Sequence, residues 1–274
     1  MLFREMHIED VPILVISLDR RPDRWAAFQQ RAQAANMKNV QRLSAVDAKT
    51  FDAQNYPGIS LLTAHNIKNK TRRAHHEIDR PGAVGCSLSH FKAWEHLQNS
   101  SAPAIIVFED DSMVPLDFNR RLRKALAELP SEWDMVTFFN TQYAGGLSGC
   151  TPISTEQPWS SCTSLMGAHA YMLSRRGASR LLSRAFPIEM HVDAYMAFMA
   201  RLNHIKMIWT PDMQFEQVLE DSDINHGDTG ILNIPTNMEK HGIVALDMTS
   251  LIGVMTMAAV VGGLVSLAYV VRKR

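Results

Sequence analysis

Short apolar runs alternate with longer amphipathic stretches between residues 12 and 209, and this alternation predicts strands and helices in turn. The apolar runs predict strands at residues 12–18, 41–46, 104–109, 133–139, 168–173 and 205–209. The amphipathic stretches predict helices at residues 22–36, 82–98, 118–129, 175–185 and 194–202. Strands that alternate with helices are typical of an α/β protein in which helices flank one sheet.

The pattern changes near the end of the chain. Residues 248–271 carry no charged side chain, and as a helix they are long enough to cross a bilayer. We predict a C-terminal transmembrane helix there, with a folded domain at residues 1–235, a juxtamembrane linker at 236–247 and a basic tail at 272–274. The membrane is thus an expected partner.

The two ends of the chain predict different topologies for this anchor. The amino end shows no secretory signal, which favours a single-pass, tail-anchored protein with its domain in the cytosol. The basic tail, read by the positive-inside rule, favours a luminal domain instead. Sequons at Asn69 and Asn99 offer a test by deglycosylation.

The strand at residues 104–109 ends in three consecutive acids, Glu109, Asp110 and Asp111. Ligands of parallel sheets collect at the carboxyl ends of the strands, which is where these acids lie. Along an extended backbone Glu109 and Asp111 project to one side, so their carboxylates converge. Such hard oxygen ligands suit Mg²⁺ or Mn²⁺. The alternative is that Asp110 or Asp111 caps the helix that follows.

The first strand leads into a turn rich in arginine and then into a helix that opens with Pro22. The free N–H groups of the helix start and the guanidinium groups of Arg20, Arg21 and Arg24 suit a phosphate. Asp47, after the second strand, is placed to meet a ribose hydroxyl. The alternatives are a solvated, salt-bridged turn and a turn residue that bonds its own backbone.

Three further stretches carry candidate chemistry. Residues 67–80 are rich in cations and suggest either a lid or a solvated surface loop. Residues 140–163 form a long predicted loop, which we assign to acceptor recognition. Glu189 and Asp193 precede or open a helix, where the helix dipole favours acids, and either carboxylate could also act as a general base.

Charge and cysteine content narrow the possible partners. The chain has 28 Lys and Arg against 28 Asp and Glu, so its formal net charge is zero and we expect no nucleic-acid partner. The three cysteines, Cys86, Cys150 and Cys162, show no metal-ligand spacing. Their number favours buried free thiols in a reducing compartment, and a disulfide between Cys150 and Cys162 stays open.

Taken together, these segments resemble glycosyltransferase family 25, which includes bacterial lipooligosaccharide galactosyltransferases and procollagen galactosyltransferases. The resemblance covers residues 12–224 and rests on ISLDRRPDRW, SAVDA, GAVGCSLSHFKAWEHL, IIVFEDDS, WDMVTF, GAHAYMLSRRGASRLL, PIEMHVDAYM and the stretch from Gln217 to SDI. It implies a GT-A-type, Rossmann-like mixed sheet and an inverting transfer of a hexose, most commonly galactose. The donor would be a UDP-sugar, the cofactor Mn²⁺ or Mg²⁺, and the acceptor a glycan, glycolipid or hydroxylated protein.

The resemblance also assigns roles by motif. It implies Glu109 and Asp111 as metal ligands and Asp193 as catalytic base, with Glu189 as second choice. The remaining matched positions would bind the nucleotide sugar: Ser17, Arg21, Arg24, Asp47, Ser89, His90 and Asp110. Without the motif, a lone helical histidine such as His90 is typical of a structural role. Ala48 departs from the family pattern, which usually has Gly there, and the membrane span is not part of that pattern.

Two other functional classes compete with the enzyme. One is a membrane-tethered, catalytically inactive protein that binds a sugar nucleotide or a glycan. The other is a tail-anchored scaffold that binds only protein. The intact acid triplet favours the enzyme.

Overall fold

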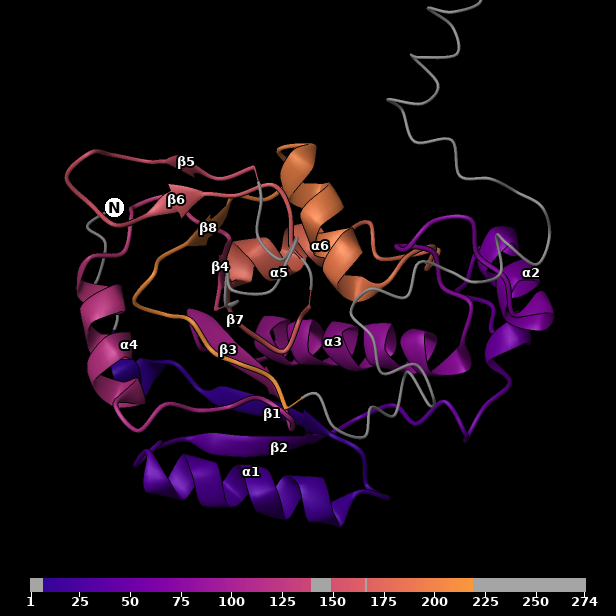
Figure 1. Cartoon of the computed structure of the whole chain (residues 1–274), viewed down its shortest axis with the longest axis horizontal. Coiled ribbons are helices and arrows are strands. Elements are labelled where there is room, and N and C mark those ends of the chain that lie inside the picture. The colour runs from indigo at the N-terminus through magenta and orange to yellow at the C-terminus, as the bar shows by residue number, and fades with distance from the viewer. Residues whose placement is uncertain (1–6, 139–148, 166, 219–274) are drawn as a thin grey trace, which may run out of the picture. The chain divides into compact units, whose positions relative to one another are not determined.

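The computed structural model describes residues 7–138, 149–165 and 167–218 (Figure 1). The chain divides into two units, Met1–Thr71 with His76–Ile231 and Arg72–His75 with Leu232–Arg274. In the second unit only Arg72–His75 is described, where the Arg72 guanidinium donates to the carbonyl oxygen of His75 over 3.4 Å. The expected domain boundaries at residues 235 and 247 lie outside the described residues. The elements below belong to the first unit.

Within the described residues, eight strands form one mixed sheet in the order β2-β1-β3-β7-β4-β8-β6-β5. Strand β1 runs parallel to β2 and β3, whereas β7 lies antiparallel between β3 and β4. The strand bounds are β1 Ile13–Ser17, β2 Val40–Ser44, β3 Ala104–Glu109, β4 Met135–Thr137, β5 Thr151–Pro152, β6 Ser160–Ser161, β7 Ala170–Ser174 and β8 Met207–Trp209. Figure 1 shows β1 and β3 side by side near α3.

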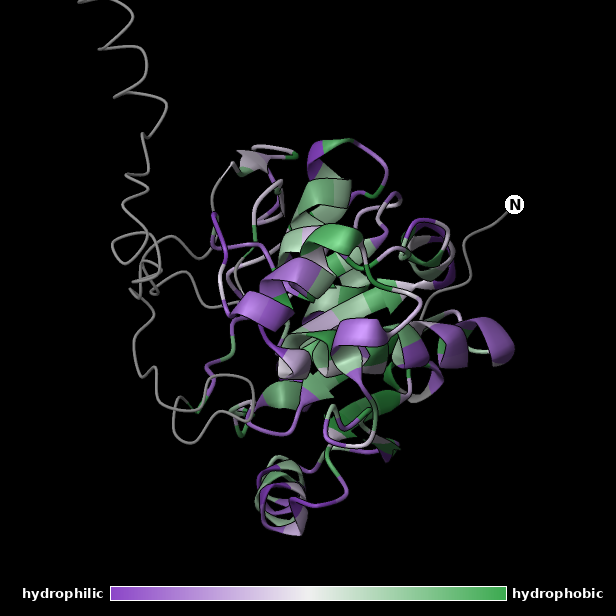
Figure 2. Ribbon diagram, turned by 90° about the vertical axis from the view of Figure 1, so that its right-hand side faces the viewer, coloured by the Kyte–Doolittle hydropathy of each residue, from purple (hydrophilic) through white to green (hydrophobic). Residues whose placement is uncertain are grey.

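Helices cover both faces of this sheet. Their bounds are α1 Pro22–Ala34, α2 Leu61–Asn69, α3 Pro81–Asn99, α4 Phe118–Ala127, α5 Arg175–Leu182 and α6 Val192–Arg201, with 3-10 turns η1 Ile8–Asp10 and η2 Ala53–Asn55. Figure 2 shows hydrophobic ribbon in the middle of this unit and mixed colouring on the helices around it. The observed mixed sheet with flanking helices agrees with the expectation from the sequence.

Alternation along the central strands builds a core on each face. Ile105 and Val107 of β3 pack in one core with Trp94 of α3, whereas Ile106 and Phe108 pack in the other with Phe28 of α1. Successive side chains of a strand point to opposite faces, so a strand buried on both faces is apolar throughout. Burial of each such side chain contributes about 1.5–3 kcal/mol. The carboxyl end of β3 is therefore held rigidly between two packed layers.

Three elements were not expected from the sequence. Helix α2 has no clear apolar stripe, and β5 and β6 have two residues each, which is too short to show a period. The lid hypothesis for residues 67–80 fails at both ends of that stretch. Residues 67–69 belong to α2, and Glu77, Ile78 and Asp79 are buried.

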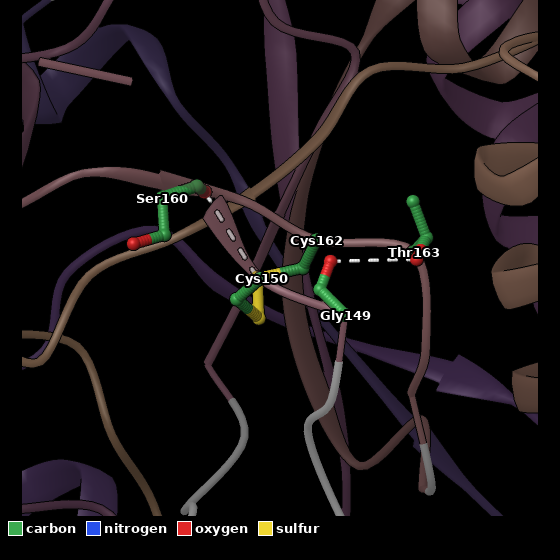
Figure 3. The surroundings of a disulfide bond; sticks show 5 residues. All are labelled: Gly149, Cys150, Ser160, Cys162 and Thr163. Atoms are coloured by element: carbon green, nitrogen blue, oxygen red, sulfur yellow. Dashed lines mark hydrogen bonds between the residues drawn. A yellow bond between two sulfur atoms is a disulfide. The ribbon is translucent and has the colours of Figure 1, made fainter. Parts of the chain in front are cut away.

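The expectation of free thiols is wrong for two of the three cysteines. Cys150 and Cys162 form a disulfide that closes the hairpin of β5 and β6, with Cα atoms 4.1 Å apart (Figure 3). Beside it, the Thr163 hydroxyl donates to the Gly149 carbonyl oxygen over 3.4 Å. Part of the loop assigned to acceptor recognition is thus cross-linked, and its residues 140–148 lie outside the described residues. Cys86 is a free thiol.

The predicted transmembrane helix and the single-pass membrane localisation need correction. In the described ranges, no helix is both long and apolar enough to span a membrane. The longest helix there, α3, has 19 residues and is not apolar enough to be a span. Residues 248–271, on which the prediction rested, lie outside the described residues. The structure therefore does not support a C-terminal anchor.

Candidate active site

The three acids lie in a turn at the carboxyl end of β3, which we call the acid turn (Glu109, Asp110 and Asp111). Backbone bonds hold this turn: Glu109 N donates to His169 O over 2.8 Å and Asp110 N to Ile16 O over 3.2 Å. The strand ends at Glu109, so the extended geometry assumed from the sequence stops there. Glu109 consequently faces α3, whereas Asp110 and Asp111 both contact α1.

Helix α1 supplies positive charge to this turn. The guanidinium of Arg24 lies 2.7 Å from a carboxylate oxygen of Asp110 and 2.7 Å from one of Asp111. One helical face carries Arg24, the fully buried Phe28 and Arg31, whose guanidinium donates to the Asp110 carbonyl oxygen over 2.6 Å. Packing of Phe28 against the sheet thus aims both arginines at the acids.

A late segment of the chain completes this side. The Gln217 amide donates to Asp111 over 3.0 Å, and Val218 N donates to the Asp111 carbonyl oxygen over 2.8 Å. Met113 N also bonds Glu216 O over 2.7 Å, so residues 216–218 run beside the acid turn.

Helix α3 and strand β7 hold Glu109 through a chain of buried aromatic rings. The Trp94 indole N–H donates to the Tyr171 hydroxyl over 2.8 Å, and that hydroxyl lies 2.8 Å from His90 Nδ1. His90 Nε2 lies 3.2 Å from Glu109 Oε1. Burial keeps the pKa of Tyr171 well above its ordinary value, so the phenol stays protonated. The lowered pKa of Glu109, described next, leaves its side chain as a carboxylate that only accepts, so His90 Nε2–H donates to it.

The pKa values of the two candidate metal ligands move in opposite directions. Burial disfavours the Glu109 carboxylate, but the His90 hydrogen bond and the nearby charges of His90, His169 and Arg24 outweigh it and lower its pKa. Burial and the Glu109 charge raise the pKa of Asp111 to about 7, against the opposing effects of Arg24 and Gln217. Near neutral pH the Asp111 carboxyl is therefore protonated in part of the molecules, and a cation bound there would displace that proton.

The residues present fit a divalent ion of the Mg²⁺ or Mn²⁺ type. Asp111 Oδ1 is buried and has no hydrogen-bond partner among the described residues. Arg24 and Gln217 contact the other oxygen of that carboxylate, so Oδ1 stays available to an ion. Glu109 and Asp111 provide two hard oxygen ligands, which is the usual protein share when substrate phosphates supply others.

A second group of ligand types lies on the α3 side of the acid turn. Ligand atoms of Cys86, His90 and Glu109 all lie within 4.8 Å of one another. Among the described residues, these three side chains are close enough together to share one ion.

The residues expected to border a nucleotide lie in different surroundings in the structure. Ser17, at the end of β1, is buried and its hydroxyl has no hydrogen-bond partner among the described residues. Asp47 binds the Arg20 guanidinium over 2.8 Å, whereas Arg21 pairs locally with the exposed Asp23 over 2.9 Å. Ser17 lies close to Asp110 in the sheet, because Asp110 N donates to the carbonyl oxygen of the preceding Ile16.

Ser89 connects α3 to the loop after β2. Its hydroxyl donates to Gly85 O over 2.7 Å and accepts from Val46 N over 2.8 Å. A Cβ at Gly85 would lie 2.6 Å from Val46 O, so this close approach requires glycine. The contacts of Ser89 explain it as a support for residues 46–48.

The two candidate bases lie on different surfaces. Asp193 opens α6, and its carboxylate accepts from Gly167 N over 2.6 Å and from Ala194 N over 2.8 Å. Its charge is one of those that raise the pKa of Cys86, after burial and Glu109. Glu189 is exposed and lines a separate cavity of about 320 Å³ with Phe91 and Tyr195.

The sequence reasoning missed several residues of this site: Arg31, Cys86, Trp94, Tyr171 and Gln217. A signal existed for Arg31, which follows Arg24 by seven positions and so lies on the same helical face. Gln217 stood in a recognised motif without a role, and Tyr171 is far from His90 in sequence.

Comparison with known proteins agrees with the resemblance of the sequence. The family model described as "Glycosyltransferase family 25 (LPS biosynthesis protein)" matches residues 10–196. The chain is similar to "Inactive glycosyltransferase 25 family member 3" of Mus musculus, with 26% identity over 74% of this chain and 34% of that protein. It is also similar to "Procollagen galactosyltransferase 1" of Danio rerio, with 27% identity over 68% of this chain and 31% of that protein. The chain spans about one third of the length of these relatives.

Proposed function

Because the chain belongs to glycosyltransferase family 25, we propose that it transfers a hexose, namely galactose, from a UDP-sugar to a hydroxyl group with inversion at the anomeric carbon. The acceptor is a glycan, a glycolipid or a hydroxylated protein. The name of the Danio rerio relative supports galactose. The observation that carries the proposal is the buried acid turn at the carboxyl end of β3, with Asp111 Oδ1 available and two arginines beside it.

In this proposal Glu109 and Asp111 would hold Mn²⁺ or Mg²⁺. The bound ion would neutralise the negative charge that develops on the diphosphate leaving group. The His90 hydrogen bond fixes the orientation of Glu109, and Arg24 keeps Asp110 and Asp111 together. Ser17, Arg21, Asp47 and Ser89 would border the nucleotide sugar, with Ser89 acting through the loop it supports.

Asp193 is the proposed general base. The acceptor oxygen forms a bond to the anomeric carbon while the bond from that carbon to the diphosphate breaks, and the hydroxyl proton passes to Asp193. Two backbone N–H groups orient its carboxylate, which prepares it for this step. Glu189 is the second choice, because its carboxylate lines the separate cavity.

The test is a panel of UDP-sugars assayed with Mn²⁺ and with EDTA, for both donor binding and transfer. Asp111→Asn should abolish metal-dependent donor binding. Asp193→Asn should lower kcat about 10²–10⁴-fold with donor affinity nearly unchanged. Glu189→Gln is the matched control and should retain turnover. Loss of turnover in Glu189→Gln alone would move the base to Glu189, and full turnover in Asp111→Asn would refute the proposed metal site.

The name of the Mus musculus relative favours a second candidate function. The Mus musculus relative is named as inactive, so a chain of this family can lack turnover. An inactive binder would bind a UDP-sugar with Mn²⁺ but show neither transfer nor donor hydrolysis. A protein-binding scaffold would show no donor binding at all, and no metal-dependent change in thermal stability.

A further inference from the structure

We propose that Cys86, His90 and Glu109 form a second metal site that takes Zn²⁺ through one sulfur, one nitrogen and one oxygen ligand. This site is distinct from the proposed Mg²⁺ or Mn²⁺ site at Glu109 and Asp111, although the two share Glu109. Its existence does not depend on the transferase activity, whereas its effect on turnover, described below, rests on the proposed function.

The helix geometry brings the three ligands together. Cys86 and His90 are four residues apart on α3, so their side chains lie on one face of the helix, one turn apart. Glu109 ends β3, which packs against α3, and His90 Nε2 already lies 3.2 Å from its carboxylate. Ligand atoms of the three residues lie within 4.8 Å of one another, and small side-chain movements bring such atoms to the ligand separations of a tetrahedral site.

The electrostatics of the site favour a cation. Burial raises the pKa of Cys86, and the charges of Glu109, Asp193 and Asp111 raise it further. The same negative potential that disfavours a bare thiolate there stabilises a divalent ion and the thiolate bound to it. The mixed sulfur and nitrogen ligands suit Zn²⁺ and disfavour Mg²⁺, which needs oxygen ligands.

The chemistry of binding balances with one proton released per ion. The Cys86 thiol loses its proton and the sulfur binds the ion. His90 changes tautomer, so that Nε2 binds the ion and Nδ1–H donates to the Tyr171 oxygen, as the second nitrogen of a metal-bound histidine usually does. Three protein ligands leave the fourth position to water.

Sharing of Glu109 has a functional consequence. When Zn²⁺ occupies the second site, Glu109 is no longer available to the ion at Asp111. Zn²⁺ should therefore inhibit a transferase that is assayed with Mg²⁺, and a chelator selective for Zn²⁺ should restore turnover.

The first experiment titrates the metal-free protein with Co²⁺, a spectroscopic substitute for Zn²⁺, in buffer without reductant. The chain has three cysteines and two of them form the disulfide, so a thiolate-to-cobalt charge-transfer band reports Cys86. We expect the band in the wild-type protein, its loss in Cys86→Ser, and its retention in Asp111→Asn. Zn²⁺ should remove the band at one ion per chain, whereas excess Mg²⁺ should not.

Several results would overturn the proposal. They are absence of the band in the wild-type protein at a large excess of Co²⁺, an unchanged band in Cys86→Ser, and displacement by Mg²⁺ as effective as by Zn²⁺. Two of these results come from the wild-type protein, so the test holds even if a variant fails to fold.

The second experiment measures turnover. The Zn²⁺ concentration that halves the rate should rise at least ~10-fold in Cys86→Ser, relative to the rate of the same variant without Zn²⁺. A charge-transfer band together with no transfer to any acceptor would refute the proposed function and leave the Zn²⁺ site standing. Transfer without the band would do the reverse.

Discussion

The two sides of the acid turn are held by different kinds of interaction. On the α1 side, Arg24 bridges Asp110 and Asp111 by charge, and Arg31 contacts the backbone between them. On the α3 side, a chain of hydrogen-bonded rings from Trp94 through Tyr171 and His90 ends on Glu109. One side is a set of formal charges, and the other is a set of directional hydrogen bonds among fully buried rings.

In the metal-free protein, the difference separates a side whose ion pairs exchange readily from a side whose buried hydrogen bonds hold Glu109 in place. Ion pairs of Arg24 can give way to other charges of the same sign, such as a divalent ion near the carboxylates or phosphate near the guanidinium. The rings of Trp94, Tyr171 and His90 are close to completely buried, so their hydrogen bonds have no water to replace them. The α3 side therefore fixes Glu109, and the α1 side adapts to what binds.

Removal of Arg24 should cause the largest loss of stability on either side of the acid turn. Arg24→Ala leaves the buried carboxylates of Asp110 and Asp111 without their bridging charge, and we expect a loss of about 3–5 kcal/mol in the free energy of unfolding without metal. Urea denaturation in EDTA measures this loss. Divalent metal should recover part of it, because an ion compensates the same carboxylates.

Arg21→Ala is the matched control for this variant. Its guanidinium pairs with the exposed Asp23 two residues along the chain, and such a pair contributes little, so the urea midpoint should move far less than in Arg24→Ala. An equal loss in both variants would show that Arg24 acts through α1 as a whole and has no special relation to the acid turn.

A pH series tests the charged side with a smaller effect. Since the pKa of Asp111 is raised to about 7, the folded protein holds a proton that the unfolded chain releases above pH 4. This group therefore makes stability fall as pH rises from about 4 to about 7. Asp111→Asn should raise the stability of the metal-free protein more at pH 8 than at pH 5, by about 2 kcal/mol.

The control for the pH series is an exposed carboxylate with the opposite shift. The Arg21 hydrogen bond lowers the pKa of Asp23, so Asp23→Asn removes a small stabilisation that is present at neutral pH. Urea midpoints measured at both pH values give both differences. A gain for Asp111→Asn that is equal at pH 5 and pH 8 would contradict the proton assigned to Asp111.

A change on the α3 side gives the smallest predicted loss of stability. Tyr171→Phe leaves the Trp94 indole N–H and His90 Nδ1 without the phenol, at a cost of about 1–2 kcal/mol. The ¹⁵N NMR signal of His90 Nδ1 should then shift, because that nitrogen loses its hydrogen-bond partner. Tyr195→Phe, which removes a hydrogen bond to Leu181 O, should leave the His90 signals unchanged. A shift of the His90 signals in that variant would mean that the chain of hydrogen-bonded rings extends to α6.

Local spacing predicted the parts of the site that lie within one element. The apolar run before Glu109 predicted both the strand and the edge at which the acids lie, and the family motifs identified Arg24 and His90. Strand periodicity could not place Asp111, because β3 ends at Glu109. Only the observed turn brings Asp111 to Arg24.

Contacts between distant segments could not be predicted in this way. Gln217 is 106 positions from Asp111, and Tyr171 is 81 positions from His90, so no periodicity links them. The disulfide was left open because two cysteines twelve positions apart carry no geometry in the sequence alone. Two-residue strands such as β5 and β6 are below the length at which a pattern can be read.

The close approach at Gly85 has a consequence for protein engineering. Helix α3 carries Cys86 and His90, and its position depends on direct backbone proximity to the carbonyl of Val46. A graft of this candidate site onto another scaffold would therefore have to include residues 45–48 along with α3 and the acid turn. A transplanted helix without residues 45–48 would lose the backbone contact that fixes its position.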